Sequence, residues 1–98
     1  MSKPESKVED YLVTGVVKRG GWAAKIVDTG RRGVPDRECR FPGPNTIYVE
    51  TKADKGRLKP WQKEYHTLLR SLGYLVFVLW TNEQVDEFFK HYDKGVYG

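Results

Sequence analysis

The stretch from residue 46 to residue 80 constrains the fold most strongly, because strand, helix and strand patterns follow one another within it. Residues 46–52 are rich in β-branched side chains and have an apolar centre at 47–49, and residues 75–80 are apolar throughout. Between them, Pro60 suits the first turn of a helix, and Gly73 suits its end. This order favours parallel pairing of the two strands with a right-handed crossover. The continuous apolar run at residues 75–80 also indicates a strand that is covered on both faces.

Apolar periodicity and turn residues place the remaining elements. A first helix is expected from about Pro4 to Arg19, with a capping box at residues 2–5 and a stop at Gly20-Gly21. Strands are expected at 22–28 and 36–41, and a last helix after a capping box at 81–84. The prediction is one domain, residues 1–98, with an α/β fold: a small mixed sheet flanked by helices, in the order α-β-β-β-α-β-α. The helix residues expected to be buried are Val8, Tyr11, Leu12, Val16, Trp61, Tyr65, Leu68, Leu69, Leu72, Val85, Phe88, Phe89 and Tyr92.

Acidic and basic residues gather near the expected strand ends. Asp36 follows a Gly-Val-Pro turn, and Glu50 and Lys52 are two residues apart in one strand. They therefore face the same side, while Thr51 turns its side chain away but keeps its carbonyl oxygen available. Carboxylate and carbonyl oxygens suit Mg²⁺, and a lysine beside them could stabilise an anionic transition state. Although Pro-Asp alone is an ordinary turn and Glu-x-Lys an ordinary charge pair, their combination indicates metal-dependent phosphodiester hydrolysis.

Three blocks in this order resemble the VRR-NUC (virus-type replication-repair nuclease) family of the PD-(D/E)xK nuclease superfamily. They are Gly-Arg-Arg-Gly-Val-Pro-Asp at 30–36, Ile-Tyr-Val-Glu-Thr-Lys at 47–52 and Leu-Lys-Pro-Trp-Gln at 58–62. The resemblance runs from about residue 5 to residue 92. It departs from the family mainly at Thr51, where many members carry a larger aliphatic residue.

The resemblance implies a restriction-endonuclease-like core and an endonuclease that depends on Mg²⁺ or Mn²⁺ and leaves 5′-phosphate ends. Stand-alone members of similar size are often phage-encoded and act as homodimers on branched DNA such as four-way (Holliday) junctions. A homodimer acting on branched DNA, with a role in DNA repair, is therefore expected here. No small-molecule cofactor is expected.

The resemblance also implies roles for residues outside the strand motif. Gln62 would orient water or phosphate, and Glu9, which borders the buried face of the first helix, would project toward the sheet as a metal ligand. Glu5, one turn earlier, is the alternative carboxylate, although it also fits the capping box. The implied catalytic set is Glu9, Asp36, Glu50, Lys52 and Gln62. The implied metal ligands are Asp36, Glu50, the Thr51 carbonyl and, directly or through water, Glu9.

Basic residues in two loops are candidates for contacts with DNA. The chain has 17 basic and 13 acidic residues and a net charge of +4, which fits a polyanionic partner. Contacts to phosphate would give salt-dependent affinity with little sequence information, and a solvated loop is the plain alternative. The candidate residues are Arg31, Arg32, Lys55, Arg57 and Lys59.

The remaining residues yield more modest expectations. His66 and His91 are expected on helix surfaces, and Cys39 is expected to be a small buried residue. A single cysteine excludes an intrachain disulfide framework and fits a reducing cytoplasm of a bacterial or phage-infected cell. No apolar run is long enough to span a membrane. The aromatic cluster of Phe88, Phe89 and Tyr92 exceeds the needs of a small core, so part of it could serve dimerisation.

Two other functions stay open at this point. One is a non-catalytic DNA-binding module that keeps the basic loops and uses its carboxylates only for structure. The other is a nuclease subunit that needs a partner protein for targeting.

Overall fold

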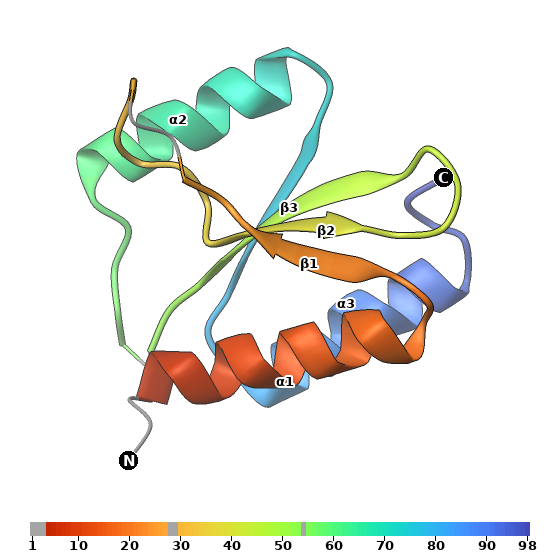
Figure 1. Ribbon diagram of the computed structural model, residues 1–98. Helices are drawn as coiled ribbons and strands as arrows, with labels where there is room; N and C mark the ends of the chain where they lie inside the picture. Colours follow the sequence, from red (N-terminus) through yellow and green to blue (C-terminus); the bar gives the residue numbers. More distant parts are fainter. Residues whose placement is uncertain (1–3, 28–29, 54) are drawn as a thin grey trace.

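One four-stranded sheet lies between two layers of helices in the computed structural model, which describes residues 4–27, 30–53 and 55–98 (Figure 1). The observed order confirms the predicted α/β fold, with boundaries within a few residues of those expected. The predicted capping box at residues 2–5 lies outside the described residues. The elements are α1 (Pro4–Lys18), β1 (Trp22–Lys25), β2 (Arg37–Arg40), β3 (Thr46–Thr51), α2 (Pro60–Ser71), β4 (Leu75–Leu79) and α3 (Asn82–Asp93).

The sheet is mixed, with the strand order β1-β2-β3-β4. The pairs β1–β2 and β2–β3 are antiparallel, whereas β3 and β4 are parallel, as the sequence pattern predicted. β4 is therefore an edge strand, and its apolar run is only partly covered. Val76 and Leu79 are buried, but Leu75 is 39% exposed, so the expectation that both faces of this strand are covered is wrong at its first residue.

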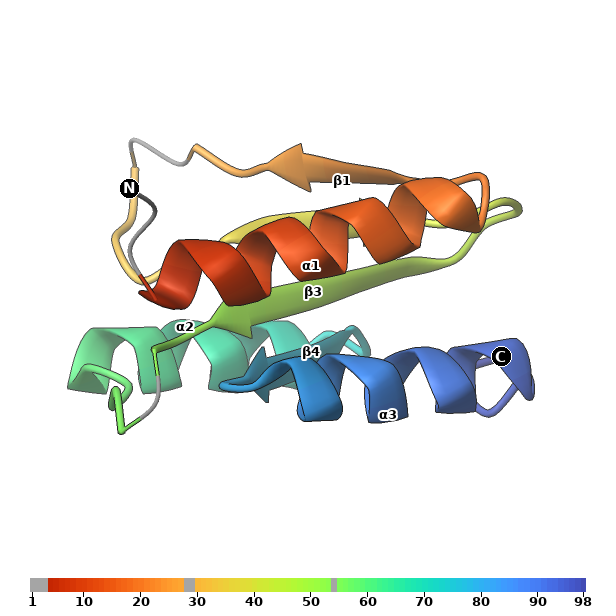
Figure 2. The same cartoon turned by 90° about the horizontal axis from the view of Figure 1, so that it is seen from below.

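Helices α1 and α3 cover one face of the sheet and α2 lies on the other, as Figures 1 and 2 show. The main apolar core lies on the face of α1 and α3, and the ring of Phe41 stacks on that of Tyr92 with centroids 4.0 Å apart. Burial of these side chains is the principal stabilising contribution. The buried members of this core are Val8, Leu12, Val16, Ala23, Cys39, Phe41, Ile47, Val49, Leu79, Val85, Phe88 and Phe89. The prediction that Cys39 is buried is confirmed.

The second helix buries only part of the predicted apolar stripe. Its buried residues are His66 and Leu69, whereas Leu68 and Leu72 are 38% and 65% exposed. Two polar contacts turn the helix this way: Gln62 donates to Glu50 of β3, and Arg70 donates to the Val76 carbonyl of β4. The predicted apolar stripe is therefore wrong in part, and so is the surface position predicted for His66.

The last helix begins as predicted. The Thr81 hydroxyl accepts a hydrogen bond from the Gln84 amide N–H at 3.1 Å, and the Gln84 side-chain carbonyl accepts one from the Trp80 N–H at 2.6 Å. These bonds satisfy two backbone donors near the helix start. In the part of the chain that the structure describes, no helix has both the length and the apolar character needed to cross a membrane.

Candidate active site at the end of β3

Residues distant in sequence meet at the carboxyl end of β3. Because β2 runs antiparallel to β3, with Arg37 opposite Val49, Asp36 lies beside the last residues of β3. Glu50 and Thr51, the last two residues of β3, are both only 3% exposed. The sheet thus brings the Pro-Asp turn next to the Glu-x-Lys segment.

Asp36 is held in place by Thr51, the residue at which the sequence departs from the family that it resembles. Its Oδ2 accepts two hydrogen bonds from Thr51, one from the backbone N–H at 2.8 Å and one from the hydroxyl at 2.9 Å. An aliphatic side chain could not make the second bond. Both bonds go to Oδ2, so the two contacts together fix the orientation of the carboxylate.

The cost of burying the Glu50 carboxylate is only partly offset by hydrogen bonds and opposite charge. Its Oε2 lies 3.6 Å from Lys52 Nζ and accepts a hydrogen bond from Gln62 Nε2 at 3.2 Å. Its Oε1 is buried and has no hydrogen-bond partner among the described residues. Burial, and then the negative charge of Asp36, raise the pKa of Glu50 to about 7, although Lys52 and a backbone hydrogen bond from Asp36 act in the opposite direction. Such a group would be stabilised by a cation at the site.

Gln62 links Glu50 to the start of α2. Its side-chain carbonyl accepts a hydrogen bond from the Lys59 N–H at 2.8 Å, which satisfies a free donor at the helix terminus. Its side-chain amide then donates to Glu50, so both ends of the group are used. The position of Gln62 beside the strand end is as predicted.

Glu9 projects toward the sheet but contacts a different partner. Its Oε2 lies 2.7 Å from Nε of Arg37, whose Nη1 also donates to the Ala23 carbonyl. Among the described residues, no group of three or more His, Cys, Asp or Glu side chains is placed to hold a metal ion. The metal role of Glu9 therefore stays a prediction, and the side chain of Glu5 lies outside the described part.

The loop before Asp36 packs closely on the start of α2. A Cβ on Gly33 would lie 2.3 Å from the Trp61 carbonyl oxygen, and Gly33 also has a φ of +94°. The guanidinium of Arg32 stacks on the Trp61 ring at 4.0 Å from its centroid, and that of Arg31 lies 5.7 Å from the Tyr65 centroid. The glycine allows the close approach, and the arginines stabilise it.

Replacement of Gly33 with alanine should therefore damage the site through the backbone. We expect Gly33→Ala to lower the free energy of unfolding by about 2–4 kcal/mol, through both positive-φ strain and the clash with Trp61. Gly43→Ala is the matched control, because Gly43 has a φ of +84° but nothing within 4 Å of the added Cβ. It should cost about 1 kcal/mol. Urea unfolding monitored by circular dichroism would test this, and equal losses in the two variants would contradict it.

The predicted DNA-contacting residues lie on the rim of this region. Arg31, Arg32, Lys55, Arg57 and Lys59 are all exposed. The indole N–H of Trp80 donates to the Gly56 carbonyl at 2.6 Å, which ties the second basic loop to the end of β4. The exposure of these side chains fits contact with a polyanion but does not test it.

His66 is a residue near the site that sequence reasoning missed. It is fully buried on α2, one turn after Gln62. Burial, and then the charges of Arg70 and Lys52, lower the pKa of its imidazole. The spacing of four residues from Gln62 puts His66 on the same face of the helix, and this spacing could have indicated its burial. The run of leucines farther along the helix pointed to a different face.

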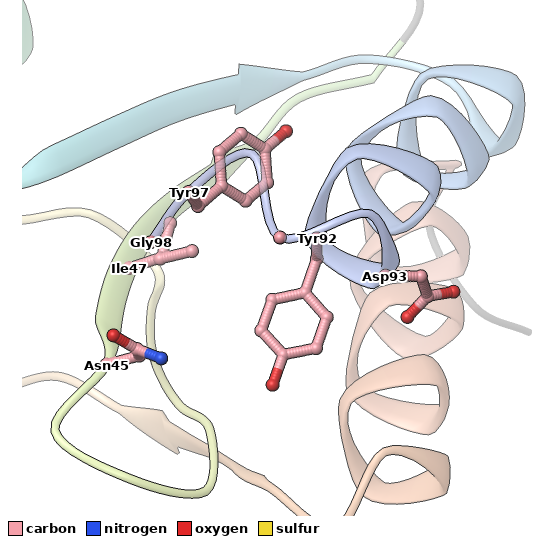
Figure 3. A pocket seen from close by; sticks show the side chains of 7 residues that line it. Asn45, Ile47, Tyr92, Asp93, Tyr97 and Gly98 are labelled. Carbon is pink, nitrogen blue, oxygen red and sulfur yellow. The ribbon is translucent and has the colours of Figure 1, made fainter.

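One cavity lies at the other end of the sheet. It has a volume of about 360 Å³ and lies near Asn45, Ile47, Tyr92, Asp93 and Tyr97 (Figure 3). The acidic side chain in its lining, Asp93, forms an ion pair with Arg19 at 2.8 Å. The cavity is therefore distinct from the carboxylate site at the end of β3.

Known proteins resemble this chain in sequence and in structure. No family model matches the chain. A protein named as a candidate nuclease, p44, of Acyrthosiphon pisum secondary endosymbiont phage 1 is 45% identical over 75 residues, which cover 76% of this chain and 81% of that protein. A solved structure described as a VRR_NUC domain superimposes with a TM-score of 0.85 and 29% identity, covering 93% of this chain and 99% of that one.

Proposed function

Because the chain belongs to the VRR-NUC family of nucleases, we propose that it is a metal-dependent endonuclease that hydrolyses phosphodiester bonds in branched DNA such as Holliday junctions. The similarity to p44 and to the VRR_NUC domain supports a nuclease. The observation that carries the metal-dependent part is the buried Oε1 of Glu50, which has no hydrogen-bond partner among the described residues and lies close to Asp36 and Lys52.

The residues at the end of β3 fit a small divalent cation. Asp36, Glu50 and the Thr51 carbonyl would hold Mg²⁺ or Mn²⁺, because Mg²⁺ is commonly bound by one or two carboxylates together with substrate phosphate oxygens and water. The bound cation would neutralise the phosphate and acidify a water molecule. Two carboxylates are therefore sufficient without Glu9, which could join them through water.

The surrounding side chains would orient the reactants. Thr51 keeps the carboxylate of Asp36 in one orientation, and Gln62 does the same for Glu50. Lys52 Nζ, 3.6 Å from Glu50, places a positive charge where the phosphate becomes more anionic or where hydroxide is held. The rim arginines and lysines would contact the DNA backbone, which predicts salt-dependent affinity.

A cleavage assay tests this function directly. A labelled four-way junction, a linear duplex and a single strand of matching sequence would each be incubated with Mg²⁺, Mn²⁺ or EDTA. We expect metal-dependent cutting of the junction in preference to the other substrates. In Asp36→Asn we expect no cutting, although the remaining side-chain carbonyl can still accept the two bonds from Thr51.

If all three substrates stay intact with both metals, the proposal is wrong. Tight metal-independent binding would then favour a binding module or a subunit that needs a partner.

We also propose that two copies associate through an apolar patch at the end of α2 and the start of β4. The patch consists of Leu68, Leu72, Tyr74 and Leu75, which are 38%, 65%, 44% and 39% exposed. Of the aromatic cluster considered for dimerisation, Phe88 and Phe89 are buried in the core, and Tyr92 is only partly buried. A pair formed through α2 would join the helices that also carry Gln62, which suits paired incisions across a junction.

The patch makes a specific prediction for oligomeric state. We expect the wild type to sediment as a dimer and Leu72→Glu to sediment as a monomer, because the charge would be buried at the interface. Val17→Glu is the control, since Val17 is 55% exposed but lies on α1. A monomeric wild type at tens of micromolar, or a dimeric Leu72→Glu variant, would contradict this interface.

A further inference from the structure

Two side chains near the candidate site carry buried polar atoms that have no hydrogen-bond partner among the described residues. These atoms are Oε1 of Glu50 and both ring nitrogens of His66. A buried polar atom without a partner destabilises the folded state, because it has lost its hydrogen bonds to water. A leucine would avoid that cost at position 66, so the histidine calls for a physical reason.

The backbone places the two side chains on facing surfaces. Glu50 points toward α2, where Gln62 contacts it, and His66 follows Gln62 by one turn on the same helix. His66 is fully buried, so it faces the sheet and not solvent. His66 therefore shares with Gln62 the face of α2 that packs on the sheet near Glu50.

The chemistry of the two groups is complementary. A neutral imidazole has one N–H donor and one acceptor nitrogen, whereas an ionised carboxylate only accepts. A buried water needs two or more polar partners, and these two groups would supply an acceptor and a donor. Each carboxylate oxygen has two lone-pair sites, so Oε1 can accept from such a water and still face a cation.

We propose that His66 is a positioning residue for Glu50, to which one ring N–H donates through a single buried water at Oε1. The inference rests on the proposed function insofar as Glu50 holds the metal. The bridge fixes the second oxygen of the carboxylate, as Gln62 fixes the first. Outer partners of metal ligands typically change metal affinity by about 10–100-fold, which sets the size of the expected effect.

Three substitutions separate this role from simple core packing. His66→Leu fills the space without a donor, His66→Asn places an amide nitrogen near Nδ1, and His66→Gln places one near Nε2. Mn²⁺ binding to the DNA-free protein would be measured by calorimetry. We expect His66→Leu to weaken binding about 10-fold or more, with one of the two amide variants within about 3-fold of the wild type. Wild-type affinity in His66→Leu would overturn the proposal, as would equal loss in all three variants.

A second measurement needs neither metal nor an altered His66. The chain has two histidines, so His91→Gln leaves the His66 ring as a single signal in ¹⁵N NMR. We expect one ring N–H protected from solvent exchange, with a nitrogen shift that changes on Glu50→Gln. A ring without a protected proton, or one insensitive to Glu50→Gln, would overturn the bridge. If the wild type binds no Mn²⁺, the metal-dependent function fails, and the NMR result alone decides the role of His66.

Discussion

Lys52→Ala is expected to lower the rate of junction cleavage by about 10²–10³-fold while junction binding changes little. Lys52 Nζ lies 3.6 Å from Glu50, and its side chain is only 15% exposed, so in the proposed mechanism its charge would act at the reacting phosphate and not on the DNA surface. The loss should therefore appear in single-turnover rates. Metal affinity should not be weakened, because the substitution removes a competing positive charge.

Lys55→Ala is the matched control for this effect. Lys55 is an exposed lysine in the loop that follows β3. Its removal should weaken junction binding uniformly and reduce the salt dependence of affinity, with little change in the single-turnover rate at saturating protein. A Lys52→Ala variant that cuts at the wild-type rate would remove this lysine from the catalytic machinery. Binding without cutting in the wild type itself would favour the non-catalytic module.

Glu50→Gln is expected to abolish Mn²⁺ binding and yet stabilise the metal-free protein at pH 8. The pKa of Glu50 in the folded chain is about 7, above its ordinary value of 4.5, because burial disfavours the carboxylate. The folded state therefore loses stability as pH rises from about 4.5 through 7, and the loss is complete above that range. We expect it to amount to about 1–3 kcal/mol, which the uncharged glutamine avoids.

Urea unfolding at pH 5 and pH 8, with EDTA present, would measure this difference. The stabilisation by Glu50→Gln should be small at pH 5 and largest at pH 8. Glu64→Gln, an exposed position on α2, should show no such pH dependence. Added Mn²⁺ should then stabilise only the wild type, because ligands that bind the folded state alone shift the unfolding equilibrium. Destabilisation by Glu50→Gln at pH 8 without metal would show that the Glu50 carboxylate is well compensated in the folded state.

Much of the site could be predicted because it depends on local rules. The two-residue repeat of a strand puts Glu50 and Lys52 on one face, and Pro60 places Gln62 in the first turn of a helix. Parallel pairing of β3 and β4 followed from the strand-helix-strand order. These features depend on local spacing or on the order of the elements along the chain, both of which can be read from the sequence.

Other features could not be predicted because they depend on contacts between distant segments. The spacing of apolar residues on α2 fits more than one buried face, and the leucines suggested the wrong one. The bonds from Gln62 to Glu50 and from Arg70 to Val76 turn His66 inward instead. Likewise, the helical pattern placed Glu9 toward the sheet, but its partner Arg37 comes from β2, which is distant in sequence.

By itself, then, the sequence determined the order of the elements, the shared face of Glu50 and Lys52, and the family, because these depend on local spacing and on motif order. Only the tertiary structure decided which groups are buried together. The antiparallel register brings Asp36 to Thr51, and the packing of α2 on β3 and β4 isolates Glu50 and His66 from solvent. The physical reason is that burial, and with it the raised pKa of Glu50, is created by neighbours far apart in the chain.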